Sequence, residues 1–412
     1  MKGKPQVVFV CQVFYPDSTP TSQVFSRLFQ KLADRGLEVT VLCGYPGRME
    51  RLEMNLPRNE SIGGIHILRC GWNISFKRSY FHRFFSYFSF LTHVGWKLIW
   101  SGRKGVVLGV TNPPFLSIIL FLTSCLGRFQ YQYIFHDLYP EGLVALNKLR
   151  GDSILVKFWT FLNRISYQRA SVLSVLGRDM IPLLQKNYAI ANEKFIHIPN
   201  WSTVDISSPR EFSKNSLARE LGIENKVVVQ YSGNMGLWHD LETFVRAAAI
   251  LRDQDSIQFL FIGGGIRRES AVKLSQQLNL NNIIWRDFVP KEQLAESLSC
   301  AHISLISLKK GLEGIAVPSK LYGILASGRP LIAQVPNDSE IALVIEEEGC
   351  GFVVEPEQSD PLAVAIRTLA ENKDLRVNMG NRAFDAYQKK YTVERAARTF
   401  EELWGIQKSE IQ

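Results

Sequence analysis

Residues 303–333 constrain the fold more than any other part of the chain. The apolar run Ile303–Leu308 ends in a loop, a short apolar segment then stops at Gly328, and a second strand-like run follows. Ser319 suits the start of a helix and Gly328 its end, and Pro330 blocks continuation. The pattern predicts a short helix between two buried strands, with its N-terminus at the carboxyl edge of a sheet.

Such a helix start is suited to anions. Its free N–H groups and its dipole favour negative charge, and phosphate above all. Lys320, in the first turn, adds a full positive charge where the dipole would prefer a carboxylate. A phosphate-binding helix is the functional reading. An ordinary strand–helix–strand unit with a surface lysine is the alternative.

Strands and helices alternate through both halves of the chain, which predicts an α/β protein with two doubly wound sheets. The predicted strands of the first half are Val7–Val13, Glu38–Cys43, Ile65–Arg69, Val106–Val110, Tyr131–Phe135, Val172–Val175 and Phe195–Ile198. Those of the second half, besides the two in residues 303–333, are Val227–Tyr231, Ile257–Ile262 and Ile283–Phe288.

A chain of 412 residues is too long for one core and fits two domains. We expect them at residues 1–205 and 206–391, and we expect the amphipathic tail, residues 392–412, to pack back on the first domain. Ligands of doubly wound domains bind at the carboxyl ends of the strands. The cleft between the two domains is therefore the predicted active site.

Charge divides the chain unevenly. Residues 1–205 hold 24 basic and 12 acidic residues, a net charge of +12, whereas the remainder has a net charge of −3. A basic half suggests nucleic acid, an anionic membrane surface or a phosphorylated acceptor as partner. Between Phe76 and Trp100, basic residues alternate with many aromatic ones, which favours a membrane surface; core packing of the aromatics is the alternative. No nucleic-acid module is recognisable, so we expect no nucleic-acid partner.

The cysteines and the apolar runs indicate the compartment. Six cysteines are scattered without metal-ligand spacing, which is typical of buried thiols in a reducing environment. The longest apolar stretch, Pro113–Leu126, is shorter than the ~20 residues that span a bilayer. We expect a cytoplasmic protein, peripheral on the inner face of the plasma membrane.

Two glycine motifs follow predicted strands of the second half. FIGGG at 261–265 and YSGNMG at 231–236 allow a close approach of backbone to a ligand. Nucleotide contact is the functional reading of the first, and a diphosphate-facing loop that of the second; plain glycine turns are the alternative for both. Asp240 is placed to cap the helix that follows.

Two polar motifs follow predicted strands of the first half. FHDLYPE at 135–141 presents His136, Asp137 and Glu141, of which one of the first two is expected to act on a substrate hydroxyl. YPDSTPTSQ at 15–23 has short hydroxylated residues that suit a polyol or phosphate. Helix capping by Thr21 or Ser22 is an equal alternative there.

With these motifs in order, the chain resembles the GT-B glycosyltransferases of family four, the retaining class that uses nucleotide sugars. The resemblance covers the whole chain, through FYP, RGLEVTVL, DLYPE, IPNW, YSGNMG, FIGGG and VPSKLYGILASGRPLIA. It is nearest to the branch of O-antigen, capsule and exopolysaccharide assembly, including colanic-acid fucosyltransferase-like enzymes. The GT-B fold implies two Rossmann-like domains that face a cleft.

The resemblance also implies roles for individual residues. It assigns donor binding to Gly233, Asn234, Gly263, Gly264, Phe288, Val289, Pro318, Ser319, Lys320 and Leu321. It assigns acceptor binding to Ser18, Thr19, Thr21 and Glu141. The catalytic candidates are His136, Asp137, Lys320 and Glu313. No cofactor and no metal are expected if Lys320 and the helix neutralise the phosphates.

The chain departs from the family at two places. The usual pair of glutamates, eight positions apart, falls at Ile315 and Gly323, although Glu313 lies near enough to replace the first. The usual arginine after YSG is Asn234, and His239 lies near the position of the usual lysine. We therefore expect more reliance on Lys320 and on backbone donors; a weak or inactive member is the alternative.

The sequence thus predicts retaining transfer of a sugar, from a donor expected to be UDP-linked, to a saccharide or polyprenyl-diphosphate-linked acceptor in cell-surface polysaccharide synthesis. Two rivals belong to other classes. A nucleotide-sugar epimerase of the same fold would convert the donor without an acceptor. A non-catalytic sugar-nucleotide-binding assembly protein is favoured by the loss of both glutamates.

Overall fold

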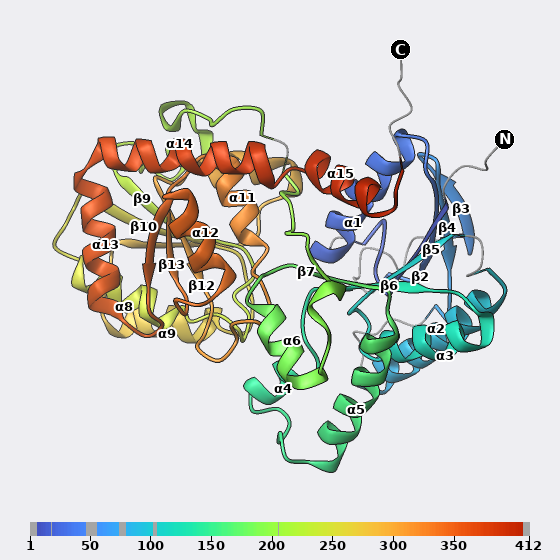
Figure 1. Ribbon diagram of the computed structural model, residues 1–412. Coiled ribbons are helices and arrows are strands. Elements are labelled where there is room, and N and C mark those ends of the chain that lie inside the picture. The colour runs from blue at the N-terminus through green and yellow to red at the C-terminus, as the bar shows by residue number, and fades with distance from the viewer. Residues whose placement is uncertain are drawn as a thin grey trace. The chain divides into compact units, whose positions relative to one another are not determined.

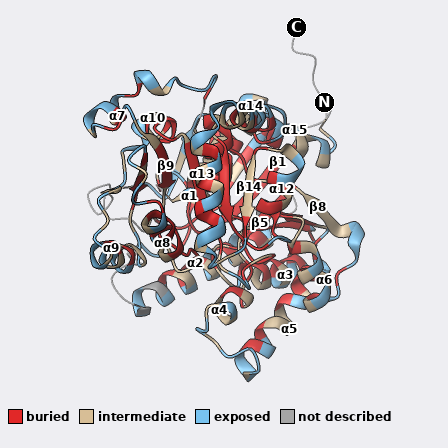
Figure 2. Ribbon diagram, turned by 90° about the vertical axis from the view of Figure 1, so that its left-hand side faces the viewer, coloured by how far each residue is buried: buried red, intermediate tan, exposed pale blue. Residues whose placement is uncertain are grey.

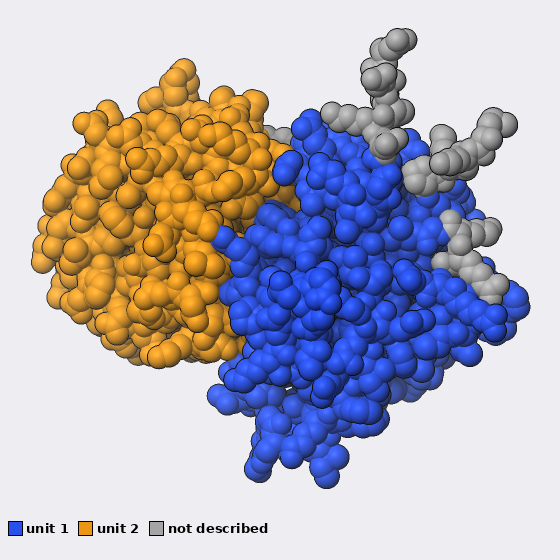
Figure 3. Space-filling model, in the orientation of Figure 1, with its two compact units in different colours: residues 1–200, 393–412 blue, residues 201–392 orange. Residues whose placement is uncertain are grey.

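The computed structural model describes residues 6–17, 19–46, 56–73, 80–101, 105–204 and 206–406. The chain forms two compact units (Figure 3). Unit 1 comprises residues 1–200 and 393–412, and unit 2 comprises residues 201–392. The sequence predicted the boundary at residue 205, whereas the observed division falls after Asn200.

Within the described residues, unit 1 is built on an eight-stranded sheet in the order β3-β4-β2-β1-β5-β6-β7-β8. The strands are β1 (Gln6–Cys11), β2 (Glu38–Cys43), β3 (Asn59–Ile62), β4 (Ile65–Arg69), β5 (Val106–Val110), β6 (Tyr131–Phe135), β7 (Val172–Val175) and β8 (Phe195–His197). Neighbouring strands are parallel except β3 and β4, which form an antiparallel pair at the edge. The central strands are apolar runs because helices cover both faces of the sheet.

The helices of unit 1 lie in two layers (Figure 1). They are α1 (Pro20–Asp34), α2 (Tyr80–Ser101), α3 (Leu116–Gly127), α4 (Glu141–Ala145), α5 (Ile154–Arg169), α6 (Met180–Tyr188), the 3-10 turn η3 (Asn192–Lys194) and α15 (Val393–Leu403). Helices α1 and α15 cover one face, and α2, α3 and α5 the other. Two ion pairs of 2.8 Å, Lys31–Glu394 and Arg35–Glu401, join α15 to α1.

Unit 2 has a fully parallel six-stranded sheet in its described residues, in the order β11-β10-β9-β12-β13-β14. Its strands are β9 (Val227–Ser232), β10 (Ile257–Ile262), β11 (Ile283–Arg286), β12 (Ile303–Ser307), β13 (Leu331–Gln334) and β14 (Gly351–Val354). The sheet is the most deeply buried layer (Figure 2), which matches its apolar sequence.

Helices sandwich this second sheet. Those of unit 2 are α7 (Ser216–Glu220), α8 (Glu242–Ile250), α9 (Arg268–Gln277), α10 (Leu294–Ser299), α11 (Lys320–Ser327), α12 (Glu340–Glu348), α13 (Ser359–Glu371) and α14 (Lys373–Lys390), with 3-10 turns η4 (Phe212–Lys214) and η5 (Lys291–Gln293). Numbered within the unit, the strand order is 3-2-1-4-5-6, the doubly wound arrangement of nucleotide-binding domains. The predicted fold class, two doubly wound α/β domains, is confirmed.

The structure bears on the cysteines and on the apolar helices. The six cysteines are all free, but Cys125 is exposed, so the expectation that all are buried is wrong for this one. Across the described part of the chain, no helix combines the length and the apolar run that crossing a bilayer requires.

Candidate active site

The strand order of unit 2 locates the edge where this fold binds ligands. The order reverses between β9 and β12, and ligands of doubly wound sheets bind at the carboxyl ends of the strands beside such a point. Gly233 directly follows β9, and the loop after β12 leads to Lys320 at the start of α11. The candidate active site is therefore built from these loops.

Glycines allow the loops after β9 and β10 to touch. Gly233 and Gly263 have φ angles of +124° and +129°, which residues with a side chain rarely adopt. A Cβ at Gly263 would overlap the carbonyl oxygen of Gly233 and would lie 3.3 Å from the ring of Phe288. The N–H of Met235 donates to the carbonyl oxygen of Gly264 at 2.8 Å. The two predicted glycine motifs thus form one surface.

Lys320 crosses this surface. Its Cε would lie 2.8 Å from a Cβ at Gly233, so only glycine leaves room for the lysine there. Its Nζ donates to the carbonyl oxygen of Asn234 and to Nε2 of His239, both at 3.0 Å, and lies 4.8 Å from the ring centroid of Tyr231. Burial lowers the pKa of Lys320 to about 7. The amine is thus held in place and titrates near neutrality.

The side chain of His239 holds the Lys320 amine in place. Its Nδ1 lies 2.6 Å from the carbonyl oxygen of Ser307 and therefore donates to it, which leaves Nε2 as the acceptor for Lys320. Burial, with the nearby Lys320, lowers the pKa of His239 to about 3, so the ring is neutral. Asp240 accepts from the N–H of Thr243 at 3.4 Å and from its hydroxyl at 2.6 Å. It therefore caps the first turn of α8, but the N-cap position is Leu241, one residue later than predicted.

The predicted start of α11 is partly wrong. Ser319 occupies the N-cap position, but its backbone is helical and its side chain makes no capping hydrogen bond, so it is not a side-chain cap. The N–H of Leu321 donates to the carbonyl oxygen of Pro318 at 3.3 Å, and the Leu321 side chain is buried. The free positive end of the helix therefore lies at Ser319 and Lys320. Gly328 ends the helix with φ +64°, as predicted.

Phe288 and Val289 have different surroundings. The ring of Phe288 lies 3.2 Å from a Cβ built on Gly264, yet 59% of this residue is exposed. An exposed aromatic face beside glycine backbone is suited to stacking on a planar group. Val289 instead packs on a core cluster that includes Val228 and Leu260. Phe288 therefore offers an exposed surface to a ligand, whereas Val289 packs on the core.

The positions of the missing glutamates hold no acid. Ile315 is buried, and Gly323 lies where a Cβ would be 3.4 Å from Leu298. Glu313, the suggested replacement, accepts a hydrogen bond of 2.7 Å from the N–H of Gly311 in its own loop. Its carboxylate therefore stabilises a turn in the structure described here, and its role towards a donor sugar stays a prediction.

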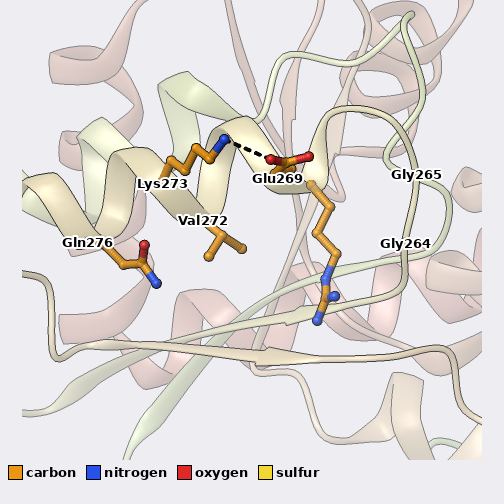
Figure 4. A pocket seen from close by; sticks show the side chains of 7 residues that line it. Gly264, Gly265, Glu269, Val272, Lys273 and Gln276 are labelled. Atoms are coloured by element: carbon orange, nitrogen blue, oxygen red, sulfur yellow. Dashed lines mark ion pairs between the residues drawn. The ribbon is translucent and has the colours of Figure 1, made fainter.

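A shallow groove of about 510 Å³ continues from the glycine surface along α9 (Figure 4). Its walls are Gly264, Gly265, Arg268, Glu269, Val272, Lys273 and Gln276. Lys273 and Glu269 form an ion pair of 2.7 Å on its rim, and Arg268 pairs with Asp287 at 3.1 Å. The groove adds polar and cationic side chains to the glycine edge.

His136 and Asp137 follow β6 in unit 1. Both backbone N–H groups donate to Oγ1 of Thr111, at 3.0 and 3.3 Å. The ring of His136 lies 5.1 Å from that of Phe25, and its buried Nε2 has no hydrogen-bond partner among the described residues. Burial lowers the pKa of His136 to about 4 and raises the pKa of Asp137 to about 6. Both groups are thus biased towards their neutral forms.

Glu141 is partly engaged. Its Oε1 accepts from Nδ2 of Asn187 at 3.0 Å and from the hydroxyl of Tyr188 at 2.5 Å. Its Oε2 is buried without a hydrogen-bond partner among the described residues. One oxygen of this carboxylate positions α6, and acceptor binding by Glu141 stays a prediction.

The hydroxylated motif lies at the start of α1. The helix begins at Pro20, and Thr19 at its N-cap makes no side-chain capping bond. Thr21 and Ser22 lie inside the first turn, so the alternative that one of them caps this helix is wrong. Ser18 lies outside the described residues. Acceptor binding by Thr19 and Thr21 stays a prediction.

Sequence reasoning missed Tyr231. Its hydroxyl donates to the carbonyl oxygen of Asn234 at 2.9 Å, and its ring lies below the Lys320 amine. Side chains two apart in a strand share a face, so the position of Tyr231 two residues before Gly233 was the available signal. The contact of His239 with Lys320 was also missed, because 81 residues separate the two.

A family model matches most of the unit that carries this candidate site. Residues 213–386 match the family model described as Glycosyl transferases group 1. This segment is a group 1 glycosyl transferase domain. The match lies inside unit 2 and contains the glycine loops, His239 and Lys320.

Relatives match more of the chain than this domain alone. The "Probable glycosyltransferase WbjE" of Pseudomonas aeruginosa is 30% identical over 65% of this chain and 66% of its own length. WcaI of Escherichia coli (strain K12), named as a colanic acid biosynthesis glycosyl transferase, is 28% identical over 55% of this chain and 56% of its own. The aligned part thus spans about two thirds of the first relative and just over half of the second.

A solved structure matches almost the whole chain. Alr3699/HepE of Anabaena, in complex with UDP-glucose, has a TM-score of 0.68 at 16% identity, over 97% of this chain and 99% of its own. With the group 1 domain and the relatives, this likeness confirms the predicted GT-B fold and the resemblance to glycosyltransferases of polysaccharide assembly.

Proposed function

We propose that the chain is a glycosyltransferase that moves a sugar from a nucleotide diphosphate sugar to an acceptor hydroxyl in cell-surface polysaccharide synthesis. One observation carries the proposal: the Lys320 amine is held over the glycine surface at the positive end of α11. A diphosphate there would meet a lysine, a helix N-terminus and close backbone. UDP is proposed as the nucleotide because the HepE structure named above contains UDP-glucose.

The proposed chemistry follows from where charge develops. The bond between the anomeric carbon and the diphosphate oxygen breaks, and negative charge accumulates on the departing diphosphate. A preorganised cation and N–H groups stabilise that charge more than the ground state, which accelerates the reaction. The acceptor oxygen bonds to the anomeric carbon, and its proton leaves. We propose retention at that carbon, as in family four, and no metal requirement.

The acceptor half of the proposal rests on unit 1. A saccharide or a polyprenyl-diphosphate-linked sugar would contact the edge that carries Asp137, Glu141 and Thr19. The net charge of +12 in residues 1–205 supports a phosphorylated, lipid-linked acceptor and a peripheral location on the inner face of the plasma membrane.

One observation favours a second candidate, a non-catalytic binder of sugar nucleotides. Ile315 and Gly323 stand where the family carries glutamates, and Glu313 is engaged in its own turn. Such a protein would retain the lysine and the glycine surface, but it would lack the carboxylate that normally contacts the donor sugar.

Thermal unfolding with UDP, GDP and ADP, followed by incubation of UDP-sugars with an acceptor pool, tests these candidates. Saturating UDP should raise the unfolding temperature by roughly 5–10 °C, and product should form only with acceptor. Nucleotide binding without product from any acceptor supports the binder. Donor conversion without acceptor supports an epimerase. If no nucleotide raises the unfolding temperature, the proposal fails.

A further inference from the structure

Helix α2 is apolar on two opposite sides. Phe90, Val94 and Leu98 are buried against unit 1. Phe84 and Trp96 point the other way and are 63% and 65% exposed. A helix with apolar residues on all sides is normally buried on all sides. The outward side of α2 therefore lacks a partner among the described residues.

The exposed aromatic rings of α2 lie in contact with one another. The ring centroids of Phe84 and Phe88 are 6.2 Å apart and stacked, and those of Trp96 and Trp100 are 6.1 Å apart. The residues recur at helical spacing, so they form one stripe along the helix. The two ring pairs lie on either side of the exposed Thr92 and differ from the single exposed hydrophobic residues that are normal in proteins.

Two neighbouring helices of the same layer also expose apolar side chains. Helix α3 packs between α2 and α5 on one side of the unit 1 sheet (Figure 1). Leu126 on α3 is 68% exposed, and Ile154 and Phe158 on α5 are 87% and 57% exposed. Of the 21 large hydrophobic residues exposed in the described part of the chain, 12 lie on these three helices. We call their outward side the three-helix face; contiguous apolar patches of this kind mark interaction sites.

Charge around the three-helix face is mostly positive, and Asp152, just before α5, is paired with Arg150 at 3.0 Å. Between Glu60 and Asp137 the sequence contains eight Lys and Arg residues and no Asp or Glu. Helix α5 contains no acidic residue either. Its Lys157 and Arg164 are exposed beside the apolar stripe and form no ion pair with a described residue. The partner of this face must therefore tolerate uncompensated positive charge.

We propose that the three-helix face binds an anionic lipid surface, with its aromatic and aliphatic side chains in the headgroup region and its cations at the phosphates. Phe and Trp beside Lys and Arg are the composition of interfacial membrane helices. The stripe offers few hydrogen-bonding groups, which suits a fluid hydrocarbon boundary better than a specific protein surface. The inference deepens the proposed lipid-linked acceptor, but it does not require that sugar transfer be correct.

Sedimentation of the 412-residue chain with vesicles tests the inference. Vesicles of phosphatidylglycerol and phosphatidylcholine in equal parts should retain the protein at low salt. Pure phosphatidylcholine should retain it poorly, and high salt should release it. At ~1 kcal/mol per cation, Lys157→Glu with Arg164→Glu should weaken retention by about 30-fold or more. Phe84→Ser with Phe88→Ser should weaken it by at least about tenfold.

Matched variants control for charge and hydrophobicity. Val364→Ser with Val377→Ser removes two exposed apolar side chains of unit 2, and Lys373→Glu with Lys389→Glu reverses two exposed charges there. Both pairs should bind vesicles like the parent chain. UDP binding in vesicle-free solution should be unchanged in all four variants, which separates a failure of this inference from a failure of the proposed function.

Three results would overturn the inference. The first is equal retention on both vesicle types. The second is unaltered retention of the face variants. The third is self-association of the parent chain, measured by sedimentation velocity without lipid, that the Phe84→Ser and Phe88→Ser pair abolishes. This last result would mean that a second copy covers the face.

Discussion

The two units carry the same strand order around their switch points but different residues at the edges that those points define. In unit 1 the order β4-β2-β1-β5-β6-β7 repeats the order of all six strands of unit 2. The unit 2 edge carries glycines, Lys320 and the neutral His239. The unit 1 edge carries His136, Asp137 and Glu141. One scaffold thus presents a cation and bare backbone in one unit, and carboxyl groups in the other.

Burial shifts the pKa values at the two edges in opposite directions, and both shifts favour the neutral form of the group. It lowers the pKa of Lys320 to about 7 and raises the pKa of Asp137 to about 6, so each group moves towards its neutral form. An anion at Lys320 would restore the positive charge of the amine. A hydroxyl that donates to Asp137 would likewise favour the charged carboxylate. The fold thus determines where a ligand binds in each unit, while the side chains determine which ligand binds at each edge.

The largest effect is expected from replacing Lys320, the cation that distinguishes the unit 2 edge from the unit 1 edge. Lys320→Ala removes the charge that stabilises the leaving group, and a lost donor of this kind costs about 100- to 1,000-fold in turnover. The measurement is release of UDP from a UDP-sugar with acceptor, with thermal unfolding as a check on folding.

Lys310 offers a matched control for that variant, because it is exposed in the loop before α11. Lys310→Ala should leave turnover within a factor of about two, since isolated surface charges contribute little. Equal rates in Lys320→Ala and the parent chain would remove the chemical distinction between the edges.

The glycine surface should be the next most sensitive feature. Gly263→Ala places a methyl group on the carbonyl oxygen of Gly233, in a backbone conformation that L-residues resist. We expect UDP affinity to fall by at least about tenfold, since each 1.4 kcal/mol of lost contact with the two loops is a factor of ten. Calorimetric titration with UDP measures it.

Gly222 provides a control that separates the effect of backbone strain from that of steric overlap with the neighbouring loop. It also has a positive φ, +66°, but nothing lies within 4 Å of a Cβ built there. Gly222→Ala should therefore cost about 1–2 kcal/mol of stability through backbone strain alone and leave UDP affinity unchanged. Equal losses of UDP affinity in both variants would show that the close approach of the two loops is unimportant.

The sequence predicted the strands better than the site. Glu38–Cys43 and Ile257–Ile262 begin and end as predicted, because strands buried on both faces read as uninterrupted apolar runs. The edge strand Asn59–Ile62 was not predicted, since its short, mostly exposed sequence lacks that signal. Local helix signals were less reliable: Gly328 ended its helix as predicted, whereas Ser319 did not cap it.

The site depended on distant contacts. The glycines and Lys320 could be selected because each follows a strand at the same edge. The hydrogen bond from Lys320 to His239 joins residues 81 positions apart, and the geometry of two loops and a helix decides it. No local pattern encodes such a contact. The lowered pKa of Lys320, which burial causes, likewise emerged only from the structure.

The lowered pKa of Lys320 predicts how UDP affinity depends on pH. Lys320, with its pKa lowered to about 7, is a cation below that pH and neutral above it, and a diphosphate binds the cation. UDP affinity should be nearly constant from pH 6.5 downwards to the phosphate pKa and should fall by up to about tenfold per unit above pH 7. Calorimetry in buffers of different ionisation enthalpy should also detect proton uptake on binding.

His239→Phe sharpens the same test. His239 accepts a hydrogen bond from Lys320, and an acceptor favours the charged amine. Its removal should lower the pKa of Lys320 further and move the loss of UDP affinity to lower pH. In Lys320→Met, the dependence above pH 7 should disappear. A dependence that persists in this variant would assign the titration to another group.

The smallest effect is expected at the unit 1 edge. Burial raises the pKa of Asp137 to about 6, so its carboxylate is lost as pH falls through that value. If the carboxylate accepts a hydrogen bond from the acceptor hydroxyl, Asp137→Asn should lower turnover by about 3- to 10-fold at pH 7, the worth of one such bond. The variant should also abolish the decline in turnover that the parent chain shows near pH 6. Asp152→Asn, at an exposed site of the same unit, should do neither. An unchanged pH profile in Asp137→Asn would assign the decline near pH 6 to another group and remove the proposed role of this carboxylate.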